Sequence, residues 1–338
     1  MWLIMPSALE NQFQTKPTKP MKDMQTKLNA TMRVAILTAG MSLITGTSVR
    51  ADTFGSGGNT FSIDFTSIGN AGNAADTTGY GAVGYTYSIG TYDISVNQLN
   101  TATANGVAGL GNGYWSGDQP AANLSWYQAA AFVNFLNTSS GHQAAYNLTY
   151  SGGAYTMALW SSGQSGYDAS NPFRNSLALY VLPSENEWYK AAYYNPANSS
   201  YNLYPTGNSV PTAVASGTAT NTAVYNNVGS QPASVYQAGG LSPYGTMGQG
   251  GNIYQLEESA YSGANTDPAG NRGIRGGFWG NYDGFLQSSG RYYGVAPDSA
   301  DIVVGFRVAE LAAVPEPSTY ALFGLGALVL VIVAKRRA

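Results

Sequence analysis

Residues 273–286, GIRGGFWGNYDGFL, combine an Arg, a Trp, paired glycines and several closely spaced aromatic side chains. This concentration is typical of a functional strand and the loop that follows it. The segment has one carboxylate, Asp283, and neither Cys nor His. General acid–base and nucleophilic catalysis need a wider set of titratable side chains. Aromatic rings beside amide and carboxylate groups instead suit ligand binding.

The chain as a whole is poor in catalytic side chains. It has no Cys, which excludes a thiolate nucleophile, a disulfide framework and a Cys-ligated metal. Its one histidine, His142, stands in the sequence SSGHQ and is predicted to be a solvated loop residue. A Ser–His–Asp triad would have to use His142, and no nucleophile-elbow motif accompanies it.

Carboxylates keep one class of enzyme open, because two Asp or Glu residues suffice for glycoside hydrolysis. Glu257 and Glu258 are adjacent in the sequence. In a strand, neighbouring side chains point to opposite faces, so these two are not expected to share a site. An enzyme that uses other carboxylates stays an alternative.

A saccharide-binding face needs flat apolar rings with hydrogen-bonding groups at their edges. The chain is rich in such rings, with 25 Tyr and 6 Trp residues. The alternative for each ring is ordinary packing in the core or a loop. The candidate ligand-binding residues are Asn281, Tyr282, Asp283, Phe285, Tyr292 and Tyr293.

Composition indicates an exported, loop-rich domain. Charged residues make up 10% of the 338 residues, against roughly 25% in an average soluble domain. Gly, Asn, Ser, Thr and Tyr replace them and favour turns and short strands. Residues 52–316 contain six Lys and Arg against sixteen Asp and Glu, a net charge of −10. This balance argues against nucleic-acid binding, which needs a basic face, and tolerates a cation such as calcium.

Two segments predict short helices. Residues 124–137 carry a capping box at Ser125 and Gln128, followed by an apolar stripe. Residues 182–195 carry a second capping box at Ser184 and Glu187. This helix is expected to end at Asn195, before a proline. Alternating segments such as 85–96 predict strands. With no internal linker or repeat, the sequence predicts one α+β domain with two short helices and many short strands.

The N-terminal region predicts a signal peptide over residues 32–51. Arg33 supplies the positive end and residues 34–46 the apolar core, and Val49 and Ala51 fit a small-residue cleavage site. Cleavage after Ala51 would start the mature domain at Asp52. Residues 1–31 precede this complete signal and are interpreted as an unused upstream extension.

The C-terminal residues 313–338 combine three features in order. Pro315, Glu316 and Pro317 precede an apolar run at 320–334, which is shorter than the ~20 residues that cross a bilayer comfortably, and a basic tail follows. This arrangement resembles the PEP-CTERM sorting signal. The resemblance implies export, recognition by an exosortase, and at least transient entry of the segment into the membrane. The cell envelope, the cell surface or the extracellular matrix is then the expected destination.

Several motifs between residues 85 and 308 occur in the order of one family. They are NLSWYQAAAFVNFLN, YVLPSENEWYKAAYY, YGTMGQGGNIYQL, GIRGGFWGN and VVGFRVA. Together they resemble the formylglycine-generating-enzyme-like, or sulfatase-modifying-factor, family. The resemblance implies a variant of the C-type lectin fold over residues 52–312.

The family's oxidative chemistry is not expected here. Relatives that oxidise a substrate cysteine hold copper with two cysteines, whose positions fall at or near Asn281 and Leu286. Neither side chain suits Cu(I), which prefers thiolate and thioether ligands. Relatives that bind iron use three histidines, and this chain has one. Arg275 and Arg307 are interpreted as ties between strands and loops, and Trp279 as a core residue.

The family's calcium-binding turn corresponds to GGNIYQLEES. Carbonyl oxygens of Gly251 and Ile253 are retained, but Gln255 stands where the family has a carboxylate, and Gly248 at another ligand position. Because calcium affinity rises with ligand charge, the sequence predicts at most a weak calcium site.

These observations favour an exported, non-catalytic binding or matrix protein on the family scaffold, with extracellular polysaccharide as the expected ligand. An envelope enzyme that uses carboxylates and a structural spacer are the alternatives. The expected partners are the export machinery and an exosortase.

Overall fold

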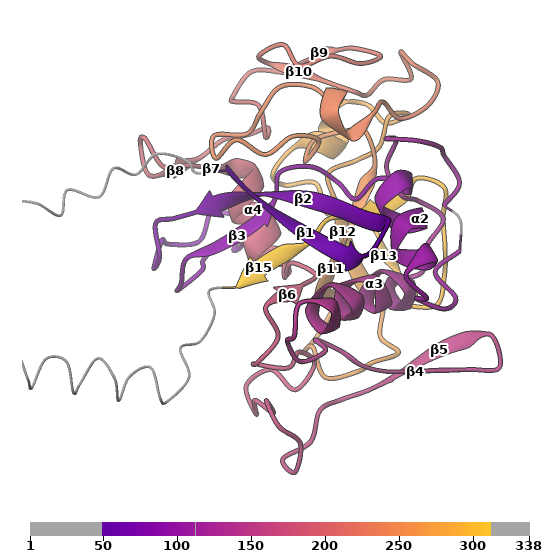
Figure 1. Cartoon of the computed structure of the whole chain (residues 1–338). Coiled ribbons are helices and arrows are strands. Elements are labelled where there is room, and N and C mark those ends of the chain that lie inside the picture. The colour runs from indigo at the N-terminus through magenta and orange to yellow at the C-terminus, as the bar shows by residue number, and fades with distance from the viewer. Residues whose placement is uncertain (1–48, 112, 312–338) are drawn as a thin grey trace, which may run out of the picture. The chain divides into compact units, whose positions relative to one another are not determined.

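The computed structural model describes residues 49–111 and 113–311 (Figure 1). The described chain is an α+β domain whose strands are short and separated by long loops. This agrees with the fold class predicted from composition. No helix within the described ranges combines the length and apolarity that a membrane crossing requires.

A five-stranded antiparallel sheet contains both ends of the described chain. Its order is β1 (Val49–Ser56), β2 (Asn59–Ile68), β3 (Tyr87–Gly90), β15 (Ala309–Leu311) and β6 (Tyr180–Val181). β15 therefore pairs with a strand more than two hundred residues earlier in the chain. Figure 1 shows this indigo and yellow sheet with α4 (Glu185–Tyr193) and α3 (Trp126–Ser139) beside it.

A second sheet positions the segment that the sequence singled out. Its order is β13 (Gly294–Val295), β12 (Arg272–Arg275), β11 (Tyr254–Ala260) and β14 (Val304–Phe306). β11 runs parallel to β14 and antiparallel to β12. The segment of residues 273–286 thus begins in β12 and ends with the 3₁₀ turn η2 (Asp283–Leu286).

The remaining elements are short. A hairpin of β4 (Asn147–Ser151) and β5 (Ala154–Ala158) projects from the body in Figure 1. Two further pairs have two residues in each strand. They are β7 (Tyr194–Asn195) with β8 (Ser200–Tyr201), and β9 (Thr212–Ala213) with β10 (Thr222–Ala223). The 3₁₀ turn η1 (Val235–Gln237) follows.

The two expected helices form, each with its capping box. Ser125 Oγ accepts from Gln128 N while Gln128 Oε1 accepts from Ser125 N, and Ser184 and Glu187 do the same in α4. α4 ends at Tyr193, two residues earlier than expected, because Tyr194 and Asn195 turn into β7.

One further helix was not expected. α2 (Val96–Ala104) begins at a third capping box, made by Ser95 and Gln98. The prediction of strand over residues 85–96 holds only for β3, because the chain turns after Gly90 to enter α2. Three α-helices therefore occur in the described residues.

The core is aromatic. Trp126 and Trp188, which lie in the first turns of α3 and α4, are fully buried. Trp126 packs edge-on against Tyr146 and Phe173 with ring centroids 5.0 and 5.3 Å apart. Trp188 Nε1 donates to Gln255 Oε1 at 2.6 Å, so its polar atom is satisfied inside the core.

Candidate functional site

The paired glycines after β12 let the backbone turn sharply. Gly276 and Gly277 have φ values of +99° and +75°, which L-residues with a Cβ rarely adopt. A Cβ on Gly276 would lie 2.9 Å from the Gln249 carbonyl oxygen. After the turn, Phe278 and Trp279 are partly buried, and η2 contains the partly buried Phe285 and the fully buried Leu286.

The two arginines of the flanking motifs are structural, as predicted. Arg275 is buried and ion-pairs with Glu185 at 2.6 Å, and its Nη1 donates to the carbonyls of Ser288 and Gly290. Arg307 is also buried. It pairs with Asp93 at 3.1 Å and donates to loop carbonyls at Gly90 and Met247.

The positions that correspond to the copper ligands serve the local structure. Asn281 Oδ1 accepts from Phe278 N at 3.0 Å, and the Asn281 carbonyl accepts from Asn226 N at 2.7 Å. Leu286 is fully buried and packs in a small cluster with Tyr204 and Tyr225. One side chain therefore holds a turn and the other fills the core.

The predicted ligand-binding aromatics come together on the surface. Tyr282 packs edge-on against Phe285 at 4.8 Å, and Phe285 contacts Tyr292 at 4.3 Å between ring centroids. Tyr292 continues to Tyr293 at 6.4 Å. The three tyrosines are 46–59% exposed, so each offers a large part of its ring to a ligand.

The row of rings extends beyond the predicted residues. Tyr293 contacts Tyr254 at 6.4 Å, Tyr254 contacts Phe278 at 5.7 Å, and Phe278 contacts Trp279 at 5.4 Å. Trp279 then meets Trp115, which meets the exposed Tyr114. We call this row the aromatic ribbon. Its members are Tyr114, Trp115, Tyr254, Phe278, Trp279, Tyr282, Phe285, Tyr292 and Tyr293.

Five members of the ribbon were not among the predicted ligand-binding residues: Tyr114, Trp115, Tyr254, Phe278 and Trp279. One signal was available, since adjacent aromatic pairs at 114–115, 278–279 and 292–293 all stand in loops rich in Gly or Asn. Trp279 was expected to be core. It is only partly buried, because the Gly276–Gly277 turn carries it out to the ribbon.

Two polar atoms in the ribbon have no partner in the described structure. The hydroxyl of Tyr254 and Nε1 of Trp279 are buried and make no hydrogen bond. Burial raises the pKa of Tyr254, so this hydroxyl stays protonated and can donate. Unpaired buried donors lower the stability of the fold, and both atoms are closed off from solvent.

Polar groups also stand at the edge of the ribbon. Asp283 is partly buried, and its Oδ2 accepts from the Tyr204 hydroxyl at 3.1 Å. Asn281 is half-buried, and its Oδ1 accepts from Phe278 N. All six predicted ligand-binding residues therefore lie in or beside the ribbon.

The residues of the expected calcium site do not fit the ion. Gln255 is buried, and its Oε1 already accepts from Arg307 Nε and Trp188 Nε1, both at 2.6 Å. Its Nε2 donates to the Gly248 carbonyl at 2.7 Å. Both lone pairs of this oxygen are used, and one of its two donors is the charged guanidinium of Arg307, which opposes a metal ion beside it. The Gly251 carbonyl accepts from Ile253 N at 2.8 Å.

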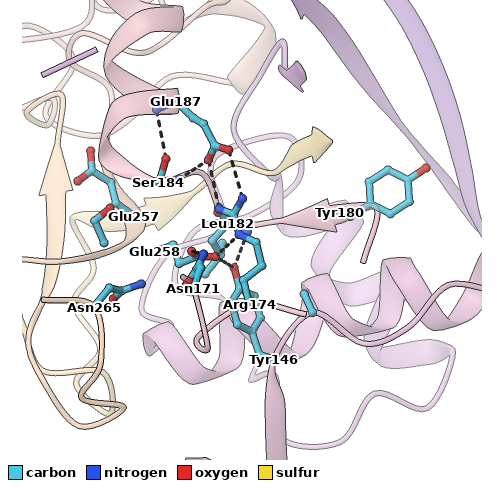
Figure 2. A network of polar contacts seen from close by, with 12 residues as sticks. Tyr146, Asn171, Arg174, Tyr180, Leu182, Ser184, Glu187, Glu257, Glu258 and Asn265 are labelled. Carbon is cyan, nitrogen blue, oxygen red and sulfur yellow. Dashed lines mark hydrogen bonds and ion pairs between the residues drawn. The ribbon is translucent and has the colours of Figure 1, made fainter. Parts of the chain in front are cut away.

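The adjacent carboxylates of β11 point apart, as expected for a strand. Glu258 enters a buried network with Arg174 at 2.7 Å and the Tyr146 hydroxyl at 2.8 Å (Figure 2). Arg174 also pairs with Glu187 at 3.2 Å. Figure 2 shows Glu257 lying away from this network.

Glu257 has a different environment. Its two oxygens are buried without a hydrogen bond in the described structure, and Arg275 Nε lies 3.9 Å from Oε1. Burial, followed by the neighbouring charge of Glu185, raises the pKa of Glu257 well above its usual value. A raised carboxyl pKa is a common sign of catalysis. Glu257 and Glu185 are nevertheless almost fully buried, so the pair gives a substrate no access.

Of the two predicted processing sites, the signal cleavage site lies at the start of the described chain. Ala51 lies in β1, where it pairs with Asp64, and the neighbouring Arg50 ion-pairs with Glu310. Cleavage after Ala51 stays a prediction and would remove Arg50 from this edge strand. Pro315, Glu316 and Pro317 lie outside the described residues.

Comparison with known proteins identifies the scaffold and the tail. Residues 29–312 match the model of the sulfatase-modifying factor enzyme 1-like domain, and residues 313–337 match the PEP-CTERM protein-sorting motif. No curated protein matches the chain.

Solved structures show the same fold. Treponema denticola variable protein 1 aligns with a TM-score of 0.55 and 19% identity over 79% of this chain and 100% of its own. CarF aligns with a TM-score of 0.53 and 18% identity over 74% of this chain and 98% of its own. PvdO from Pseudomonas aeruginosa aligns with a TM-score of 0.50 and 16% identity over 77% of this chain and 98% of its own.

Proposed function

This chain belongs to the sulfatase-modifying factor enzyme 1-like family, and from that premise we propose that it is a non-catalytic binder of extracellular polysaccharide. Its PEP-CTERM motif marks it as an exported, envelope-associated protein that is sorted by an exosortase. The family scaffold then serves to hold a binding surface instead of a redox centre.

The aromatic ribbon carries the proposal. Exposed rings of Tyr282, Tyr292 and Tyr293 offer flat apolar faces on which the C–H faces of sugar rings stack. Asn281 and Asp283 lie beside these rings and are partly exposed, so their polar groups suit the hydroxyl groups of a saccharide. A row of successive rings, longer than a single pocket, fits an extended polymer.

The metal-ligand positions support a non-catalytic role. Asn281 and Leu286 hold a turn and fill the core, so neither supplies a ligand for copper. The raised pKa of Glu257 favours the carboxylate-enzyme alternative, but its burial beside Glu185 separates both groups from solvent. A structural spacer would have no need for a row of exposed rings.

Co-sedimentation with extracellular polysaccharide from the producing cells tests the proposal. The full chain should sediment with the polymer, and Tyr292→Ala and Tyr293→Ala should each reduce the bound fraction. Tyr150→Ala is the matched control, because Tyr150 is an exposed tyrosine on β4 outside the ribbon. Equal loss in all three variants, or no sedimentation of the folded wild type, would reject polysaccharide binding by the ribbon.

A further inference from the structure

A second candidate site uses none of the ribbon residues. A cavity of about 220 Å³ lies between β2, the loop before α2, the first turn of α2, and η1. Its walls include Asp64, Tyr92, Asp93, Gln98 and Tyr236. The cavity therefore joins segments that are far apart in the sequence.

Two tyrosines form one wall. The rings of Tyr92 and Tyr236 meet edge-to-face, with centroids 4.8 Å apart and an interplanar angle of 75°. Tyr236 is 43% exposed, which leaves much of its ring open to a ligand. Gln98 holds another wall in place, because its Oε1 accepts from Ser95 N and its Nε2 donates to the Ser62 carbonyl.

The cavity is negatively charged. Asp64 is half-buried, and no protein donor in the described structure reaches its carboxylate. Asp64 lines the same cavity as the rings of Tyr92 and Tyr236. Burial and then the charge of Asp64 raise the pKa of Tyr92, whereas burial, then the charge of Asp118, and then that of Asp64 raise the pKa of Tyr236.

Asp93 adds to the wall a carboxylate that has a hydrogen-bond partner at one of its two oxygens in the described structure. Its Oδ1 accepts from Arg307 Nη2 at 3.1 Å, whereas Oδ2 is buried with no partner in the described structure. Burial raises the pKa of Asp93 to about 7 even though Arg307 opposes this. A cation in the cavity would favour the charged form. Because Oδ2 is buried, Asp93 acts on a ligand in the cavity through its charge alone. Asp64 is the carboxylate that would contact the ligand directly.

We propose that this cavity binds an organic ammonium group, with Asp64 as its counter-ion and Tyr92 and Tyr236 as its aromatic wall. Ammonium ions bind the faces of aromatic rings, and a carboxylate beside the rings adds charge attraction. The described residues contain no group of three or more His, Cys, Asp or Glu side chains placed to hold a metal ion, so an organic cation fits this cavity better than a divalent metal ion. Quaternary ammonium and primary amine groups share this chemistry.

The test is a calorimetric titration of the full chain with choline, with glucosamine, and with 3,3-dimethyl-1-butanol, the neutral isostere of choline. Saturable binding of choline or glucosamine is expected at about millimolar concentration, with none for the neutral alcohol. Asp64→Asn and Tyr236→Leu should each weaken binding at least about fivefold. Asp298→Asn removes the same charge from an exposed turn outside the cavity and should leave binding unchanged.

Each other outcome overturns the proposal. Equal binding of the neutral alcohol would show that the cavity recognises shape without charge. Equal weakening by Asp64→Asn and Asp298→Asn would show a diffuse effect of net charge. No saturable heat from either amine, with the variants and wild type folded alike by circular dichroism, would leave no ammonium site. Tyr292→Ala should not change amine binding, which separates this site from the ribbon.

Discussion

The ring of Tyr293 packs edge-on against Tyr254, with their centroids 6.4 Å apart and their planes at 86°. Tyr293 is exposed, and Tyr254 is buried with an unpaired hydroxyl. This contact joins the exposed tyrosines after β12 to the half of the ribbon that contains Trp279 and Trp115. The ribbon is therefore one continuous row of ring contacts, which is exposed at Tyr114 and at Tyr292 and Tyr293 and buried at Tyr254.

The unpaired hydroxyl of Tyr254 predicts that its removal stabilises the protein. Tyr254→Phe removes a buried polar atom that has no partner, and we expect stability to rise by about 1 kcal/mol. The same change should leave polysaccharide binding unchanged, because the hydroxyl is closed off from solvent. Thermal unfolding and a binding titration on one preparation measure both quantities.

Tyr193→Phe is the control for this change in stability. The Tyr193 hydroxyl is also buried but donates to the Leu286 carbonyl at 3.1 Å, so its removal should lower stability by about 1 kcal/mol. If Tyr254→Phe destabilises the protein as much as Tyr193→Phe does, the Tyr254 hydroxyl has a partner inside the protein.

Chelation should leave the protein unchanged. Gln255 Oε1 is occupied by Arg307 and Trp188, so we expect no calcium ion to bind there. The melting temperature with EDTA should equal that with excess calcium. An ion at 100 times its Kd would add about 2.7 kcal/mol, which a melting curve detects easily. A clear rise with calcium that magnesium does not reproduce would contradict the assignment.

The Gly276–Gly277 turn should not tolerate a side chain. Gly276→Ala forces a Cβ to within 2.9 Å of the Gln249 carbonyl oxygen at a positive φ. Strain and overpacking together should lower the free energy of unfolding by about 3 kcal/mol. Gly58→Ala has open space around its Cβ and no positive φ, so denaturant unfolding should show a much smaller change. Equal effects in the two variants would refute this role for Gly276.

The Arg174–Glu187 pair should stabilise the fold in a pH-dependent way. Burial by itself would raise the pKa of Glu187, but Arg174 outweighs it and holds the pKa below its usual value of 4.5. A carboxyl whose pKa is lower in the folded state stabilises the fold above its unfolded pKa, and this stability is lost as the pH falls through the folded pKa.

Glu187→Gln should therefore lower the free energy of unfolding at pH 7 by about 3 kcal/mol, because it removes one of the two carboxylates that pair with the buried Arg174. The difference from wild type should shrink as the pH falls below about 4. Denaturant unfolding across this range measures it. A difference that stays constant with pH would mean that the Glu187 charge contributes nothing.

Local sequence signals predicted the local structure well. The capping boxes at Ser125 and Ser184 located α3 and α4, because each device is complete within four residues. The same device at Ser95 was overlooked, since the alternating residues before it favoured a strand. Helix α2 could have been predicted from the Ser95–Gln98 spacing alone.

Long-range contacts could not be predicted in the same way. Tyr282, Phe285, Tyr292 and Tyr293 are close in sequence, so their grouping was foreseeable. Trp115 reaches Trp279 only through the tertiary fold, and no local pattern encodes that contact. The partners of Gln255 were hidden for the same reason. The sequence showed that Gln255 replaces the family's carboxylate, but not that Arg307 donates a hydrogen bond to the Gln255 side chain.

The most direct test of the account is a calorimetric titration of the full chain with fragments of extracellular polysaccharide, comparing wild type with the Tyr292→Ala, Tyr293→Ala double variant. Each stacked ring should contribute about 1 kcal/mol, so the double variant should bind at least about tenfold more weakly. Tyr150→Ala should bind like wild type. Wild-type affinity in a folded double variant would contradict the proposal that the aromatic ribbon is the binding surface.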